Sequence, residues 1–149
     1  MSSPNTIING LPLPTALVEA IHAGRWIVPA LEKLRAVFPL APIEHPLFYS
    51  LEYMPRENAH WPDETSEVFW GTKSSLVYPG DIDPKKSVLI AGLGPDQPIA
   101  LDYRESLENP SVVYLIYGED IEADDPAIDA VFWIEAAPNI ETLLSALNL

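Results

Sequence analysis

Cysteine is absent from the 149 residues of this sequence, which excludes a disulfide framework and any metal site built on thiolates. Long apolar runs are absent as well, because no stretch approaches the roughly 20 apolar residues needed to span a bilayer. The start of the sequence, Met1–Asn5, lacks the basic residues and the apolar core of a signal peptide. These absences lead us to expect a cytoplasmic protein that is not attached to a membrane.

Basic residues are scarce: 8 lysines and arginines stand against 22 aspartates and glutamates, and the formal net charge is −14. All the basic residues lie at or before Arg104, and the charges after it are all acidic. Direct binding to nucleic acid is disfavoured, since neutralising phosphates requires clustered lysine and arginine. A basic protein partner is favoured instead, because complementary fields accelerate encounter and suppress wrong partners. The alternative is that the acidity only keeps the protein soluble.

The densest acidic segment supplies the first partner-binding candidates. It follows an apolar run that is typical of a strand, and we expect it to form a loop over residues 118–127. Its carboxylates are those of Glu119, Asp120, Glu122, Asp124 and Asp125.

Motifs for catalysis and for cofactor binding are missing. No serine lies in a G-x-S-x-G elbow, and the histidines His22, His45 and His60 are too scattered to share a metal. Gly92-Leu93-Gly94 lacks the third glycine and the following helix of a dinucleotide-binding turn, so it reads as a hairpin turn. We therefore predict no catalytic residue, no metal and no cofactor. In so acidic a chain, a hydrolase with an unrecognised carboxylate pair remains a third possibility.

Apolar periodicity predicts one α+β domain over residues 1–149, with a mobile segment over residues 1–10. The expected fold is a mainly antiparallel, twisted sheet with helices packed at one side. We expect helices over 15–23, 29–38 and 139–147, strands over 47–54, 88–91, 99–104, 112–117 and 130–134, and a proline-broken loop over 55–65. Residues 67–71 are expected to form a short strand or a helical turn.

The segment 98–117 contains two apolar runs around a polar turn, and this pattern predicts a hairpin that carries charge. Alternation places Asp102 and Arg104 on the same face, where they either pair with each other or contact a partner. Among the tryptophans, Trp133 lies between two apolar residues and is expected in the core. Trp61 lies in a polar stretch and is the candidate for an exposed anchor.

Three segments resemble the SUKH superfamily, specifically its Smi/Knr-type bacterial domains. They read S-L-V-Y-P-G-D-I-D-P-K-K-S-V-L-I-A-G-L-G over 75–94, P-I-A-L-D-Y-R over 98–104, and F-W-I-E-A-A-P-N-I-E-T-L-L-S-A-L over 132–147. The resemblance implies a small intracellular α+β domain without a common enzymatic activity. Many such domains are similar to immunity proteins that neutralise polymorphic toxins, often nucleases. The stretch Leu11–Leu17 departs from the N-terminal pattern of many relatives, so no detailed binding mode is carried over.

These observations lead to one functional hypothesis with an alternative. We expect a non-enzymatic domain that binds a basic protein stoichiometrically, as an immunity protein binds a toxin, with carboxylates and an aromatic anchor at the contact. The alternative is a regulatory scaffold whose acidic surface is incidental.

Overall fold

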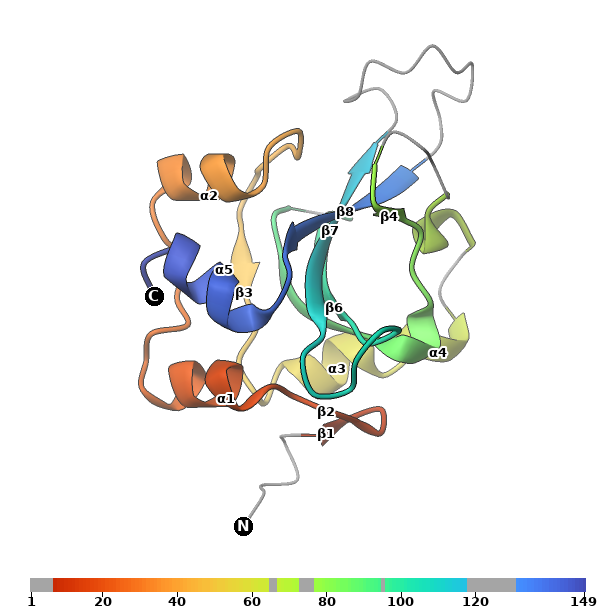
Figure 1. Cartoon of the computed structure of the whole chain (residues 1–149), viewed down its shortest axis with the longest axis horizontal. Coiled ribbons are helices and arrows are strands. Elements are labelled where there is room, and N and C mark those ends of the chain that lie inside the picture. The colour runs from red at the N-terminus through yellow and green to blue at the C-terminus, as the bar shows by residue number, and fades with distance from the viewer. Residues whose placement is uncertain (1–6, 65–66, 73–76, 95, 118–130) are drawn as a thin grey trace.

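A six-stranded sheet forms the centre of the computed structural model, which describes residues 7–64, 67–72, 77–94, 96–117 and 131–149 (Figure 1). The strand order is β3-β5-β6-β7-β8-β4, and every pairing is antiparallel. The strands are β3 (Leu47–Phe48), β4 (Pro79–Gly80), β5 (Ser87–Gly92), β6 (Pro98–Asp102), β7 (Ser111–Tyr117) and β8 (Val131–Ala137). A separate two-stranded ribbon, β1 (Ile7–Ile8) with β2 (Leu11–Pro12), precedes the first helix.

The four strands from β5 to β8 form the meander that the sequence predicts, and the α+β class is confirmed. All six residues of β5 and the five central residues of β7 are buried. Burial on both faces explains why these strands read as continuous apolar runs rather than as an alternation. The predicted hairpin of segment 98–117 is confirmed by the antiparallel pairing of β6 with β7.

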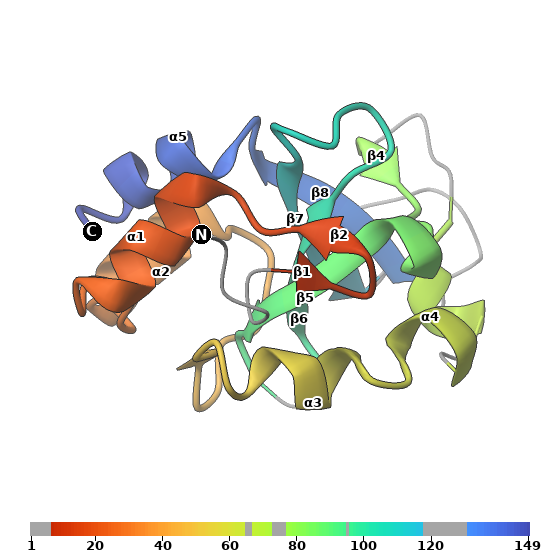
Figure 2. The ribbon, with the colours of Figure 1, turned by 90° about the horizontal axis from the view of Figure 1, so that it is seen from below.

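The predicted helices at the two ends of the chain are confirmed and lie together on one side of the sheet (Figures 1 and 2). They are α1 (Thr15–His22), α2 (Leu31–Val37) and α5 (Ile140–Ala146), and α5 contacts both of the others as well as β7 and β8. Leu17, Leu34 and Leu143 bury the inner faces of these helices. Asn139 caps α5 by accepting a hydrogen bond from the Thr142 backbone N–H at 2.8 Å.

Two short helices occupy the stretch 55–65, where the sequence predicted a loop. They are α3 (Met54–Asn58) and α4 (Trp61–Glu64), and they lie apart from the group formed by α1, α2 and α5 (Figure 2). The predicted strand over 47–54 was wrong beyond Phe48, because Ser50 begins a helical turn there. Its hydroxyl accepts a hydrogen bond from the Tyr53 N–H at 3.1 Å, and its carbonyl accepts one from Met54 at 3.0 Å.

Short 3-10 turns complete the chain: η2 (Glu67–Trp70), where a strand or helical turn was predicted, and η3 (Pro84–Lys86). Of the helices in the described part of the chain, none has both the length and the apolar character to cross a membrane.

The buried Asn58 fixes α3 against the sheet. Its amide donates to the carbonyls of Met54 and Leu89, both at 2.9 Å, and its side-chain oxygen accepts from the Leu89 N–H at 2.8 Å. The side chain therefore takes the place of a neighbouring strand at a point of β5 where β3 does not pair with it.

Candidate functional site

Arg104 is held by two carboxylates at the end of β6. Its guanidinium donates to both oxygens of Asp102 at 3.0–3.3 Å, to Asp81 Oδ1 at 2.9 Å and to the Asp81 carbonyl at 2.7 Å. Burial alone would lower the pKa of Arg104, but these hydrogen bonds outweigh it and raise the pKa above its ordinary value. The sequence left open whether Asp102 and Arg104 pair or contact a partner; in the structure they pair, although β6 ends at Asp102 and Arg104 lies just beyond it.

These residues line a cleft of about 290 Å³, which we call the Arg104 cleft. It is bounded by Tyr78, Pro79, Asp81, Asp102, Arg104 and Glu105. Tyr78 is 60% exposed, and its hydroxyl donates a 2.7 Å hydrogen bond to Glu105 Oε1. That hydrogen bond raises the pKa of Tyr78, so the phenol stays neutral and the ring is held beside the carboxylates.

Negative charge is crowded at the edge of this cleft. Burial raises the pKa of Glu135, and the nearby charges of Glu105 and Asp102 raise it further. Three carboxylates line the cleft against one guanidinium, and that guanidinium is already paired with two of them. The cleft therefore offers unbalanced negative charge to a cation that approaches from solvent.

The prediction that Trp61 is an exposed anchor was wrong. The side chain is 7% exposed, and its Nε1 donates a 2.8 Å hydrogen bond to Ser87 Oγ. Its ring meets that of Trp133 edge-on, with 6.3 Å between the ring centroids. The polar neighbours of Trp61 in the sequence suggested a surface loop, but α4 turns the indole inward. The prediction that Trp133 belongs to the core is confirmed, since it is fully buried.

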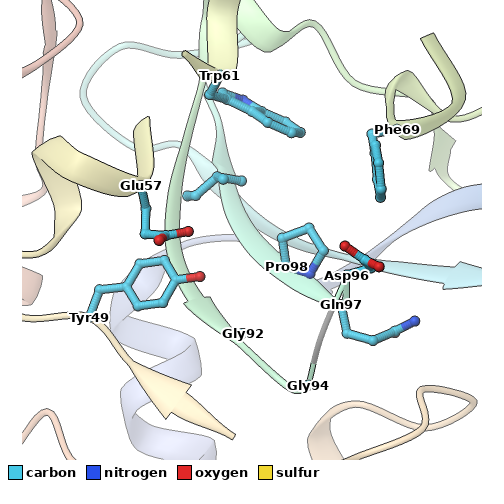
Figure 3. A pocket seen from close by; sticks show the side chains of 10 residues that line it. Tyr49, Glu57, Trp61, Phe69, Gly92, Gly94, Asp96, Gln97 and Pro98 are labelled. Atoms are coloured by element: carbon cyan, nitrogen blue, oxygen red, sulfur yellow. The ribbon is translucent and has the colours of Figure 1, made fainter. Parts of the chain in front are cut away.

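Trp61 forms part of a second hollow, the Tyr49 cavity, of about 460 Å³ (Figure 3). Its wall is formed by Tyr49, Glu57, Trp61, Phe69, Leu89, Gly92, Gly94, Asp96, Gln97 and Pro98. Tyr49 directly follows β3, Pro98 begins β6, and the other residues come from α3, α4, η2, strand β5 and the turn between β5 and β6. No sequence pattern indicates this cavity, because its wall is assembled from segments far apart in the chain.

The acidic segment with Glu119, Asp120, Glu122, Asp124 and Asp125 lies outside the described residues, so its role in partner binding stays a prediction. Over the described ranges, no group of three or more histidine, aspartate or glutamate side chains is placed to hold a metal ion.

Comparison with known proteins identifies no relative: no family model matches the chain, and no curated protein or solved structure matches it at a significant level. The resemblance to the SUKH superfamily therefore stays a prediction from the sequence.

Proposed function

We propose that this chain is a non-enzymatic domain that binds a basic protein stoichiometrically through the Arg104 cleft. The observation that carries the proposal is the exposed Tyr78 ring, held by Glu105 among carboxylates that are only partly neutralised. Exposed aromatic rings commonly anchor protein interfaces, and unbalanced carboxylates complement a basic partner and speed its encounter.

The crowding of Glu135 with Glu105 and Asp102 supports a cationic partner. Burial raises the pKa of Glu135 most, and the nearby negative charges of Glu105 and Asp102 repel its carboxylate and raise the pKa further. A lysine or arginine from a partner would relieve this repulsion, so the ionised cleft binds a cation more strongly than an isolated carboxylate would. Because Arg104 holds Asp81 and Asp102 in place, these groups need little rearrangement on binding.

The surroundings of the cleft support a protein rather than a small ion. A neighbouring hollow of about 400 Å³ shares Arg104 and Glu105 with the cleft and is also lined by Lys86 and Leu107. Leu107 is 59% exposed, so two large exposed side chains, Tyr78 and Leu107, flank Glu105. Such a surface offers both apolar contact and charge to a partner.

The biological form of this proposal is an immunity protein that blocks the cationic substrate groove of a toxin domain. It rests on the sequence resemblance to the SUKH superfamily and on the excess of acidic residues. Carboxylates that enter such a groove would compete with the substrate's phosphates. Inhibition would then be steric and electrostatic, and no covalent bond would form or break.

The experiment measures binding of the full chain to each protein encoded by the adjacent genes, by surface plasmon resonance at two salt concentrations. Three variants are compared: Glu105→Gln with Glu135→Gln, the control Glu19→Gln with Glu32→Gln, and Tyr78→Ala. The control makes the same change in net charge on the exposed faces of α1 and α2.

We expect the cleft variant to associate more slowly and with a weaker salt dependence, because it loses long-range attraction. The control variant should change the association rate and its salt dependence much less. Tyr78→Ala should raise the dissociation rate about 30-fold, as expected for a central aromatic anchor. Equal association rates and salt dependences of the cleft and control variants would exclude the Arg104 cleft as the binding site. In that case, a variant with the carboxylates of segment 119–125 changed to amides would be compared in the same assay. The lack of any complex with an adjacent gene product would overturn the immunity function.

A further inference from the structure

The Tyr49 cavity shares no lining residue with the Arg104 cleft and offers a different chemistry. Its volume of about 460 Å³ lies within the range of pockets that bind small molecules, about 300 to 1,000 Å³. Figure 3 shows Tyr49, Trp61 and Phe69 around the hollow, with Pro98 between them.

The aromatic wall is held in place by contacts outside the cavity. Trp61 is fixed by its hydrogen bond to Ser87 Oγ, and that hydroxyl in turn donates to the Asp83 carbonyl at 2.9 Å. The ring of Tyr49 packs against that of Tyr53, with 5.0 Å between centroids. Rings that are positioned before binding present their faces to a ligand at little cost in conformational entropy.

The polar groups of the wall are mainly acceptors. Glu57 and Asp96 reach the hollow from opposite sides (Figure 3), and none of the described lining residues is basic. Gln97 is 4% exposed, and its Oε1 has no hydrogen-bond partner among the described residues. A buried acceptor without a donor costs free energy, so it points to a ligand that brings N–H groups.

Tyr49 contributes a ring face and a neutral hydroxyl. Burial and the nearby charge of Glu57 raise the pKa of Tyr49 to about 12, so the phenol stays protonated at neutral pH. An anionic ligand would be repelled by the two carboxylates, whereas an ammonium group is attracted to carboxylates and to aromatic faces alike.

From this geometry we propose that the Tyr49 cavity binds a linear aliphatic diamine or polyamine. One ammonium group pairs with Glu57 near the face of Tyr49, and a second pairs with Asp96 near Gln97. The methylene chain between them packs on Leu89, Pro98 and the rings of Trp61 and Phe69. Two carboxylates on opposite sides of an apolar hollow match two charges joined by an apolar chain.

The experiment uses isothermal titration calorimetry on the full chain with diamines from 1,3-diaminopropane to 1,6-diaminohexane, with spermidine, and with n-butylamine. We expect one site and an optimum at one chain length, with the best diamine binding about tenfold or more tightly than butylamine. Glu57→Gln and Asp96→Asn should each weaken diamine binding about tenfold. Butylamine has one ammonium group, so only one of the two substitutions should weaken its binding.

The control is Glu52→Gln, which removes one charge from an exposed position near α3 but outside the cavity. Asp96 has φ +58°, a conformation that asparagine adopts readily, so Asp96→Asn tests the charge without straining the turn. Circular dichroism of each variant checks folding.

Several weak sites, with all three variants equally affected, would mean that polyamines only condense on an acidic surface, and would overturn the proposal. Equal affinity for butylamine and the diamines would overturn it too, because the cavity would then accept a single cationic head such as a lysine side chain. Diamine binding should be unchanged in Glu105→Gln with Glu135→Gln, since neither residue lines the Tyr49 cavity.

Discussion

Removing the Asn58 side chain should be among the most damaging single changes outside the hydrophobic core. Asn58 is fully buried, and its amide satisfies both the N–H and the carbonyl of Leu89 on β5. Asn58→Ala would leave these two backbone groups without a partner in a place that water does not reach. It would also release the amide's third hydrogen bond, to the Met54 carbonyl.

The expected loss follows from the cost of a buried polar group without a partner, about 1 to 3 kcal/mol each. Two such groups give a loss of about 2 to 6 kcal/mol in the free energy of unfolding, out of a total of about 5 to 15 kcal/mol for a domain of this kind. Asn58→Asp should be worse than Asn58→Ala. It keeps the acceptor for Leu89 but turns an oxygen, and at neutral pH a charge, toward the carbonyls of Met54 and Leu89.

Urea unfolding followed by circular dichroism measures the loss, with the free energy extrapolated linearly to water. Asn109→Ala, at an exposed position in the β6–β7 turn, is the matched control and should change stability by less than about 0.5 kcal/mol. If Asn58→Ala matched the control, the hydrogen bonds from α3 to β5 would contribute nothing, and the fixed position of Glu57 in the Tyr49 cavity would lose its explanation.

Two further predictions concern β8, which lies near the other edge of the sheet from β5. Trp133→Ala should lower the free energy of unfolding by about 3 to 5 kcal/mol in urea, because the indole is fully buried and donates to the Phe69 carbonyl at 2.8 Å; near-normal stability would contradict its place in the core. For Glu135, the raised pKa means that the folded state holds the proton more tightly, so stability is lost as pH rises from the ordinary glutamate pKa through the raised one. Glu135→Gln should therefore be more stable than the wild type at neutral pH, with the difference shrinking as pH falls through that range; a difference independent of pH would refute the raised pKa.

The central sheet could be predicted from the sequence because its signals are local. Strands β5, β6 and β7 are dense in β-branched and other apolar residues, and turn residues separate them. Gly92-Leu93-Gly94 was correctly interpreted as a hairpin turn. The structure adds a reason for Gly94 that the sequence does not show: a Cβ there would lie 2.8 Å from the Glu44 carbonyl oxygen.

The prediction of a loop over 55–65 was wrong because proline is compatible both with a loop and with the first turn of a helix. Pro55 and Pro62 were interpreted as breaks in a loop, yet each is the second residue of a short helix. Proline suits a first helical turn, where its missing N–H has no helical partner to lose. The useful signal was Ser50, whose side chain caps the turn that leads into α3, but a single serine in an alternating run is also compatible with a strand.

The site was predictable only in part, for a related reason. Asp102 and Arg104 lie two residues apart, so their pairing follows from local geometry. Asp81 joins them from 23 residues away, and Tyr78 is placed by β4 pairing with β8. Such contacts depend on strand order, and nothing in the residues around Tyr78 indicates which strand will lie beside it.

The two proposed binding sites lie at opposite ends of β6, and this placement decides how they interact. Gln97 and Pro98 border the Tyr49 cavity at the start of the strand, whereas Asp102 borders the Arg104 cleft at its end. At about 3.3 Å per residue, these ends are about 13 Å apart, beyond the distance at which substitutions usually couple. The residues between them are buried and paired with both β5 and β7, so β6 cannot shift without disturbing the sheet. Substitutions of Asp96 and of Glu105, beyond the two ends of β6, should therefore have additive effects, and a failed test at one site leaves the proposal at the other intact.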